Sequence, residues 1–170
     1  MKFINNVNET LRDDMAAEMQ KGSKLSIAAA YFSIYAFEAL RKELSTIDEL
    51  RFIFTDPTFI QKENSKKEKR EFYIPNLRRE RGIYGTEFEV KLRNELNQKA
   101  ITKECAEWIK KKVTFKSNVG NKEITNRFIL LNDIAYFPVN SFTTVDLGCE
   151  QGNTMSVSIA KVESPMSQAL

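Results

Sequence analysis

The hydrophobic positions near the start of the chain follow a helical period. Between residues 4 and 20 they recur in steps of three and four, which predicts an amphipathic helix. Gly22 stands just beyond this segment, where glycine commonly ends a helix. The carboxylates Asp13 and Asp14 fall within it, and we expect both of them to face water.

Two short apolar runs follow, and a helical pattern separates them. Residues 24–32 and 50–55 have the length and composition of buried strands. Ser33 is placed to cap the helix between them, whose inner face carries Phe37, Leu40 and Leu44. Strand, helix and strand at this spacing predict a parallel pair with a right-handed crossover.

The second half of the chain returns to this alternation after an interruption. We interpret residues 56–86 as a basic insertion, partly helical over residues 76–81, because prolines and the glycines Gly82 and Gly85 break its pattern. Beyond the insertion, the pattern predicts a helix over residues 87–112, a strand over 113–116 and a turn at 119–121. It then predicts a hairpin of two strands, 124–131 and 134–139, and a last strand over 154–160. Asn132-Asp133 is the expected hairpin turn. Together these elements predict an α/β fold with a mixed β-sheet flanked by helices, in a single domain over residues 1–170.

Composition removes several kinds of chemistry. The chain has 170 residues, of which 42% are hydrophobic and 29% charged, as in a globular protein. It contains no histidine, which excludes a Ser-His-Asp triad, a Cys-His pair and a Cys/His zinc site. Cys105 and Cys149 form no CxxC pair; we expect Cys105 to be buried in a helix and Cys149 to be exposed. No motif calls for a cofactor or metal, and with no signal peptide or long apolar run we expect a cytoplasmic protein.

Positive charge is concentrated in one segment. The net charge is +3, yet residues 62–81 alone hold eight Lys or Arg against four Glu. Phe72 and Tyr73 lie among these cations and could stack on bases. The cations are candidates for contacts with a nucleic-acid backbone: Lys66, Lys67, Lys69, Arg70, Arg78, Arg79 and Arg81. The alternative is a solvated loop, since charge runs commonly face water.

Two short motifs resemble the signature of the phospholipase D-like superfamily. In that family a buried strand reads His-x-Lys, four residues, Asp, and a Gly-Ser-x-Asn motif follows. TNRFILLN at residues 125–132 and NSFT at residues 140–143 resemble these motifs in degenerate form, and the order of elements over about residues 24–148 resembles that fold. The chain is similar in particular to the phospholipase D-like domain that precedes DEAD/DEAH or Swi/Snf-type helicase motors in bacteria.

The resemblance assigns a position to each degenerate residue. Thr125 falls on the nucleophilic histidine, Arg127 on the phosphate-binding lysine and Asn132 on the aspartate, whereas Asn140 and Ser141 fall on a phosphate-binding pair. A threonine without an adjacent base is a poor nucleophile, but an arginine keeps a permanent cation whose fork suits phosphate. The resemblance therefore implies a domain that holds phosphate and is not an enzyme. The alternative is that Arg127 is an edge cation and Asn132 an ordinary turn residue.

Three functions are compatible with this resemblance. The first is an accessory domain that binds nucleic acid, DNA in particular, for a helicase or restriction-type protein, with the chain's own helicase motor following residue 170. The second is a homodimerisation or docking module that works through the face near Thr125 and Asn140 without nucleic acid. The third is an active nuclease, which the absence of histidine disfavours. A membrane is not among the expected partners.

Overall fold

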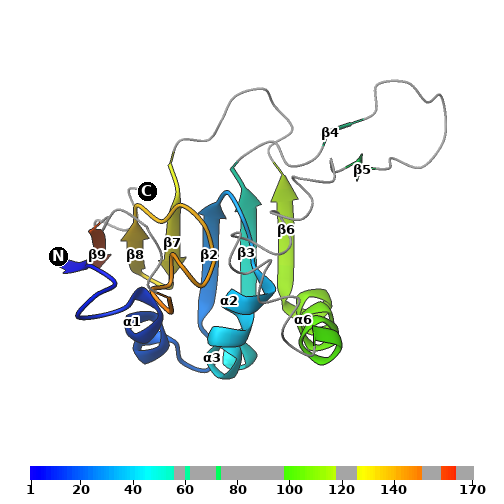
Figure 1. Ribbon diagram of the computed structural model, residues 1–170, viewed down its shortest axis with the longest axis horizontal. Helices are drawn as coiled ribbons and strands as arrows, with labels where there is room; N and C mark the ends of the chain where they lie inside the picture. The colour runs from blue at the N-terminus through cyan, green and yellow to red at the C-terminus, as the bar shows by residue number, and fades with distance from the viewer. Residues whose placement is uncertain (56–59, 62–71, 74–97, 118–125, 151–157, 164–170) are drawn as a thin grey trace.

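The computed structural model describes residues 1–55, 60–61, 72–73, 98–117, 126–150 and 158–163. Its main sheet has seven strands, in the order β1-β9-β8-β7-β2-β3-β6 (Figure 1). Those strands are β1 (Lys2–Ile4), β2 (Lys24–Ala29), β3 (Glu49–Phe54), β6 (Val113–Ser117), β7 (Phe128–Leu131), β8 (Ile134–Phe137) and β9 (Ile159–Glu163). The described helices are α1 (Leu11–Glu18), α2 (Ile34–Ala39), α3 (Arg41–Thr46) and α6 (Gln98–Lys112).

The sheet has a parallel half and an antiparallel half that meet at β2. Strand β2 runs parallel to β3, and β3 runs parallel to β6. On its other side β2 is antiparallel to β7, and β7, β8, β9 and β1 continue the antiparallel pairing. The predicted parallel pair and the predicted hairpin are both confirmed, and the fold is of the α/β class with a mixed sheet.

One face of the sheet carries the hydrophobic core. Alternate strand residues and the buried side of each helix belong to a single cluster: Leu25, Ile27, Leu50, Phe52, Leu11, Met15, Phe37, Leu44, Cys105 and Trp108, among others. On the other face of β3, Arg51 is exposed and Ile53 is 38% exposed. We expected helices on both faces of the sheet, but the helices that the structure describes all pack on the face that carries this core (Figure 1).

The predicted helix over residues 4–20 is wrong in its first part. Residues 2–4 form the edge strand β1, in which Ile4 pairs with Ile159. The side chain of Asn5 then accepts hydrogen bonds from the amides of Val7 and Asn8, both at 3.0 Å, and this turn competes with a helix. Helix α1 begins only after Thr10, whose hydroxyl accepts from the amide of Asp13 at 3.1 Å.

The other helices agree with the pattern in outline. Ser33 caps α2 by accepting from the amide of Tyr35 at 3.1 Å, as predicted. In α6 the indole of Trp108 lies 4.9 Å from the ring of Phe37 and donates to the carbonyl of Leu44 at 2.9 Å. None of the helices in the described segments is long and apolar enough to cross a bilayer.

Three expectations are corrected or fall outside the described residues. The last strand is β9, later than the predicted 154–160, and residues 151–157 are not described. The expected helix at 76–81 and turn at 119–121 also lie outside the described residues. Within the insertion, β4 (Ile60–Gln61) and β5 (Phe72–Tyr73) form a separate two-stranded ribbon.

Candidate functional site

The carboxyl ends of β2, β3 and β6 form one edge of the sheet, which we call the carboxyl edge. At this edge β2 has a parallel neighbour on one side and the antiparallel β7 on the other. In open α/β sheets, ligands commonly bind beyond the carboxyl ends of parallel strands, where the strand order reverses. The topology alone therefore makes this edge the first candidate for a binding site.

The segment after β8 is held against the carboxyl edge by backbone hydrogen bonds. The amide of Ala30 donates to the carbonyl of Asn140 at 3.0 Å, and the amide of Phe142 donates to the carbonyl of Tyr31 at 2.9 Å. The amide of Val139 donates to the carbonyl of Arg127 at 3.2 Å. In Figure 1 this orange segment crosses β7 and β2. The structure thus brings Arg127 and the Asn140-Ser141 pair to the same edge.

Several hydroxyl groups are buried near this edge. Ser33 and Thr55 follow β2 and β3, and Ser141 and Thr143 lie in the crossing segment. Thr143 is engaged within its own turn, where its hydroxyl donates to the Asp146 carboxylate at 2.7 Å. Asn140 is exposed and Arg127 is half-buried. The exposed amide of Asn140 and the half-buried guanidinium of Arg127 are hydrogen-bond donors of the kind that bind phosphate oxygens, whereas Ser141 is buried.

Asn132 lies at the opposite end of β7 from Arg127. It occupies the β7–β8 turn with a positive φ of 51°. Its side-chain oxygen accepts from the amide of Lys24 at 2.9 Å, and its side-chain amide donates to the hydroxyl of Ser23 at 3.2 Å. Asn132 therefore fastens the end of β7 to the start of β2 and does not share a pocket with Arg127. For this residue the alternative interpretation as a turn residue is confirmed.

The remaining predicted site residues lie outside the described part of the chain. They are Thr125 and the basic cations Lys66, Lys67, Lys69, Arg70, Arg78, Arg79 and Arg81. Residues 62–71 connect β4 to β5 along the chain, and Figure 1 places that ribbon beyond the carboxyl ends of β3 and β6. Within the described segments, no group of three or more His, Cys, Asp or Glu side chains is arranged to hold a metal ion.

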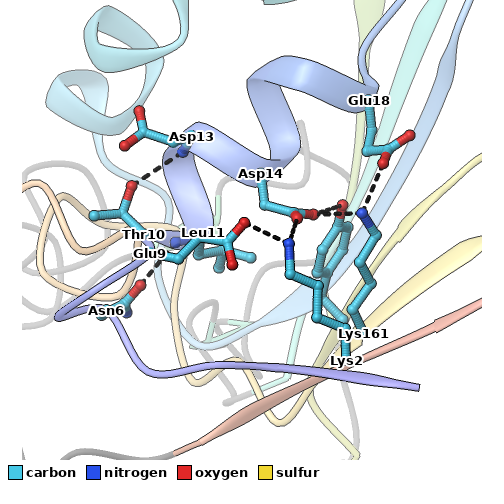
Figure 2. A network of polar contacts seen from close by, with 10 residues as sticks. Lys2, Asn6, Glu9, Thr10, Leu11, Asp13, Asp14, Glu18 and Lys161 are labelled. Atoms are coloured by element: carbon cyan, nitrogen blue, oxygen red, sulfur yellow. Dashed lines mark hydrogen bonds and ion pairs between the residues drawn. The ribbon is translucent and has the colours of Figure 1, made fainter.

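A buried ion-pair cluster, which sequence analysis missed, centres on Asp14. This carboxylate was expected to face water, but only 6% of the residue is exposed. It accepts from Lys2 at 2.9 Å and from the Tyr136 hydroxyl at 2.8 Å, and it pairs with Lys161 at 2.8 Å (Figure 2). Lys161 also donates to Glu18 at 2.7 Å. The cluster ties α1 to β1, β8 and β9.

The charges of this cluster stabilise one another against burial. Burial alone would raise the pKa of Asp14, but hydrogen bonds from Lys161, Lys2 and Tyr136 hold it below its ordinary value. Burial would likewise lower the pKa of Lys161, but its bonds to Asp14 and Glu18 raise it. Since three donors already occupy the Asp14 carboxylate, we assign this cluster to structure and not to catalysis.

The depressed pKa of Asp14 predicts a loss of stability in acid. Its contribution is fully present above the unfolded-state pKa of about 3.9, and it is lost as pH falls through the lower folded-state pKa. The free energy of unfolding, measured with urea between pH 2 and pH 6, should therefore fall more steeply with decreasing pH for the wild type than for Asp14→Asn. The asparagine side chain of the variant cannot titrate. Equal slopes for the two proteins would contradict this assignment.

Both cysteines agree with their predicted exposure. Cys149 is exposed, and Cys105 is buried in α6, where burial raises the pKa of its thiol to about 12. A thiol of so high a pKa is protonated near neutral pH and is a poor nucleophile.

Comparisons with known proteins return no relative of this chain. No protein-family description, no curated protein and no solved structure matches it.

Proposed function

We propose that this chain is a catalytically inactive phospholipase D-like domain that binds the backbone of nucleic acid, DNA in particular. Its context would be a helicase or restriction-type protein, whose motor supplies the ATPase activity. One observation carries the proposal: Arg127 and the Asn140-Ser141 pair come from two separate motifs, yet they meet at the carboxyl edge. The order of elements supports it as well, since a parallel pair, a helix with Trp108, a strand and a hairpin follow one another as the resemblance requires.

The chemistry of this edge favours binding over cleavage. A guanidinium with serine and asparagine donors can bind a phosphodiester by charge-assisted hydrogen bonds. Hydrolysis by this family's route needs an imidazole to attack the phosphorus, and the chain has no histidine. The basic segment, residues 62–81, adds further cations to the chain.

Salt-dependent DNA binding is the expected result of a direct test. Fluorescence anisotropy of labelled duplex and single-stranded oligonucleotides, titrated at several salt concentrations, should show affinity falling steeply with salt as counterions are released. Arg127→Ala should lower the slope of log K against log salt by about one, the effect of losing one phosphate contact. Charge reversal at Lys66, Lys67, Lys69 and Arg70 should lower the slope further.

Arg51→Ala is the matched control for Arg127→Ala. It removes the same charge from the opposite face of the sheet, where the Arg51 guanidinium pairs with Glu49 at 3.2 Å, and its side chain is 59% exposed. We expect this variant to bind like the wild type. Equal effects of the two substitutions would mean that only net charge matters and would remove the role of the carboxyl edge.

Absence of binding at low salt would overturn the proposed function. Light scattering on the same samples would then test the second candidate, since a dimerisation module self-associates without DNA. Cleavage of a plasmid that disappears in Thr125→Ala would instead support the third candidate, an active nuclease.

A further inference from the structure

A chain of phenylalanine rings leads from the carboxyl edge to the sheet's outer strand. Phe142, which directly follows Ser141, is stacked on Phe32 with ring centroids 5.6 Å apart. Phe32 in turn meets Phe115 of β6 edge-to-face, again at 5.6 Å. Two ring contacts therefore connect the polar Asn140-Ser141 pair to Phe115.

The ring of Phe115 packs against other aromatic rings and is also partly exposed to solvent. It stacks on Phe54 with centroids 5.6 Å apart and an interplanar angle of 21°, and it lies 5.7 Å from Phe52. Phe115 is nevertheless 36% exposed, because β6 is the last strand of the sheet. A ring that is already ordered loses little side-chain freedom when a flat partner stacks on it.

Phe115 and Arg127 lie on the same face of the sheet, and the row of residues that separates them is buried in the core. Phe115, Phe52, Ile27 and Ile129 stand in one row across β6, β3, β2 and β7. Three strand spacings of about 4.8 Å separate the ends of this row, so they lie about 14 Å apart. Arg127 precedes Ile129 by two residues, which by strand alternation places it on the same face and nearer the carboxyl edge.

We propose that Phe115 is a stacking platform for an unpaired base of single-stranded nucleic acid, whose backbone is bound at Arg127, Asn140 and Ser141. This inference rests on the proposed function and names its ligand. Proteins that bind single strands combine cations along the backbone with aromatic rings under the bases. In a duplex the bases are stacked on one another, so an exposed ring adds affinity for a single strand alone.

Replacement of the ring tests the platform. Phe115→Leu keeps an apolar side chain in β6 but removes the stacking surface. We expect it to weaken binding of a labelled single-stranded 12-mer by about 5- to 100-fold, the usual effect of losing one stacked base. Duplex affinity and the salt slope should stay unchanged, because stacking releases no counterions. Phe115→Trp should bind the single strand more tightly than the wild type, because the indole offers a larger stacking surface.

Phe3→Leu is the matched control. Phe3 is also an edge-strand phenylalanine and is 65% exposed, but it lies in β1 at the other end of the sheet. We expect this variant to bind single strands like the wild type. Circular dichroism of all variants would show whether the sheet is intact. If Phe115→Leu does not fold, Phe115→Trp decides: tighter binding of the single strand with unchanged duplex affinity supports the platform, and unchanged single-strand binding overturns it.

The outcomes separate this inference from the proposed function. A selective loss of single-strand affinity in Phe115→Leu supports both. If Arg127→Ala weakens binding while neither Phe115 substitution changes it, the platform is overturned and the proposed function stands. An equal loss for duplex and single strand also overturns the platform. If the wild type binds neither form of DNA, both proposals fail.

Discussion

Asp14→Ala is expected to destabilise the protein by about 3–5 kcal/mol, the usual cost of removing one partner from a buried ion pair. The substitution leaves Lys161, whose side chain is only 7% exposed, with Glu18 as its remaining carboxylate in the cluster. It also removes the acceptor of the Tyr136 hydroxyl, which lies in the core. A buried group without its partner costs far more than the bond itself contributes.

Asp13→Ala is the control, because the two carboxylates are neighbours with opposite surroundings. The Asp13 side chain is 61% exposed and pairs with Arg12 at 2.8 Å. An exposed pair of this kind contributes at most about 1 kcal/mol. Urea unfolding of both variants and the wild type at pH 7 gives the comparison. Similar midpoints for Asp13→Ala and Asp14→Ala would show that the buried cluster contributes no more than a surface pair.

The hydrophobic pattern predicted the central part of this fold well. The strands β2 and β3, the cap at Ser33 and the β7–β8 hairpin were all readable, because burial on one face leaves a period in the sequence. Strand β1 was not, since it has only three residues and owes its conformation to pairing with β9 at the other end of the chain. No local pattern encodes that contact.

The buried position of Asp14 did leave a signal in the sequence. Asp14 follows Leu11 by three residues and precedes Met15, so helical geometry places it beside the buried face of α1. The sequence could not supply its partner Lys161, since that pairing depends on β9 lying next to β8 and β1. A carboxylate on the apolar side of a helix predicts a buried cation but does not say where in the chain it lies.

Only some of the residues that the motif resemblance selected lie together in the fold. It selected Arg127, Asn140 and Ser141, which the fold brings to one edge. It also selected Asn132, which is five residues beyond Arg127 in the sequence. Because a strand rises by about 3.3 Å per residue, residues that are close in a motif can lie far apart along a strand. Strand β7 therefore carries Asn132 away from Arg127, to the opposite edge of the sheet.

Gly148→Ala is also expected to have a large effect, lowering the free energy of unfolding by about 3 kcal/mol. Gly148 has a φ of +75°, where a side chain costs about 1–2 kcal/mol. A Cβ there would lie 2.5 Å from Oδ1 of Asn6 and 2.7 Å from its Cγ. Asn6 cannot move freely, because it accepts from the amide of Leu11 and donates to the carbonyl of Asp146, both at 2.8 Å. Each lost hydrogen bond costs about 1 kcal/mol.

Gly22→Ala is the control that measures the cost of backbone strain alone, without the steric clash that a Cβ at residue 148 makes with Asn6. Gly22 has a similar φ of +86°, but a Cβ there would meet only the Asp48 carboxylate, at 3.8 and 3.9 Å. This variant should therefore lose about 1–2 kcal/mol in urea unfolding. In an Asn6→Gly background the Asn6 side chain is absent, so Gly148→Ala should cost no more than Gly22→Ala does in the wild type. If Gly148→Ala costs about 3 kcal/mol in both backgrounds, strain at residue 148 accounts for the whole loss and the contact with Asn6 contributes nothing.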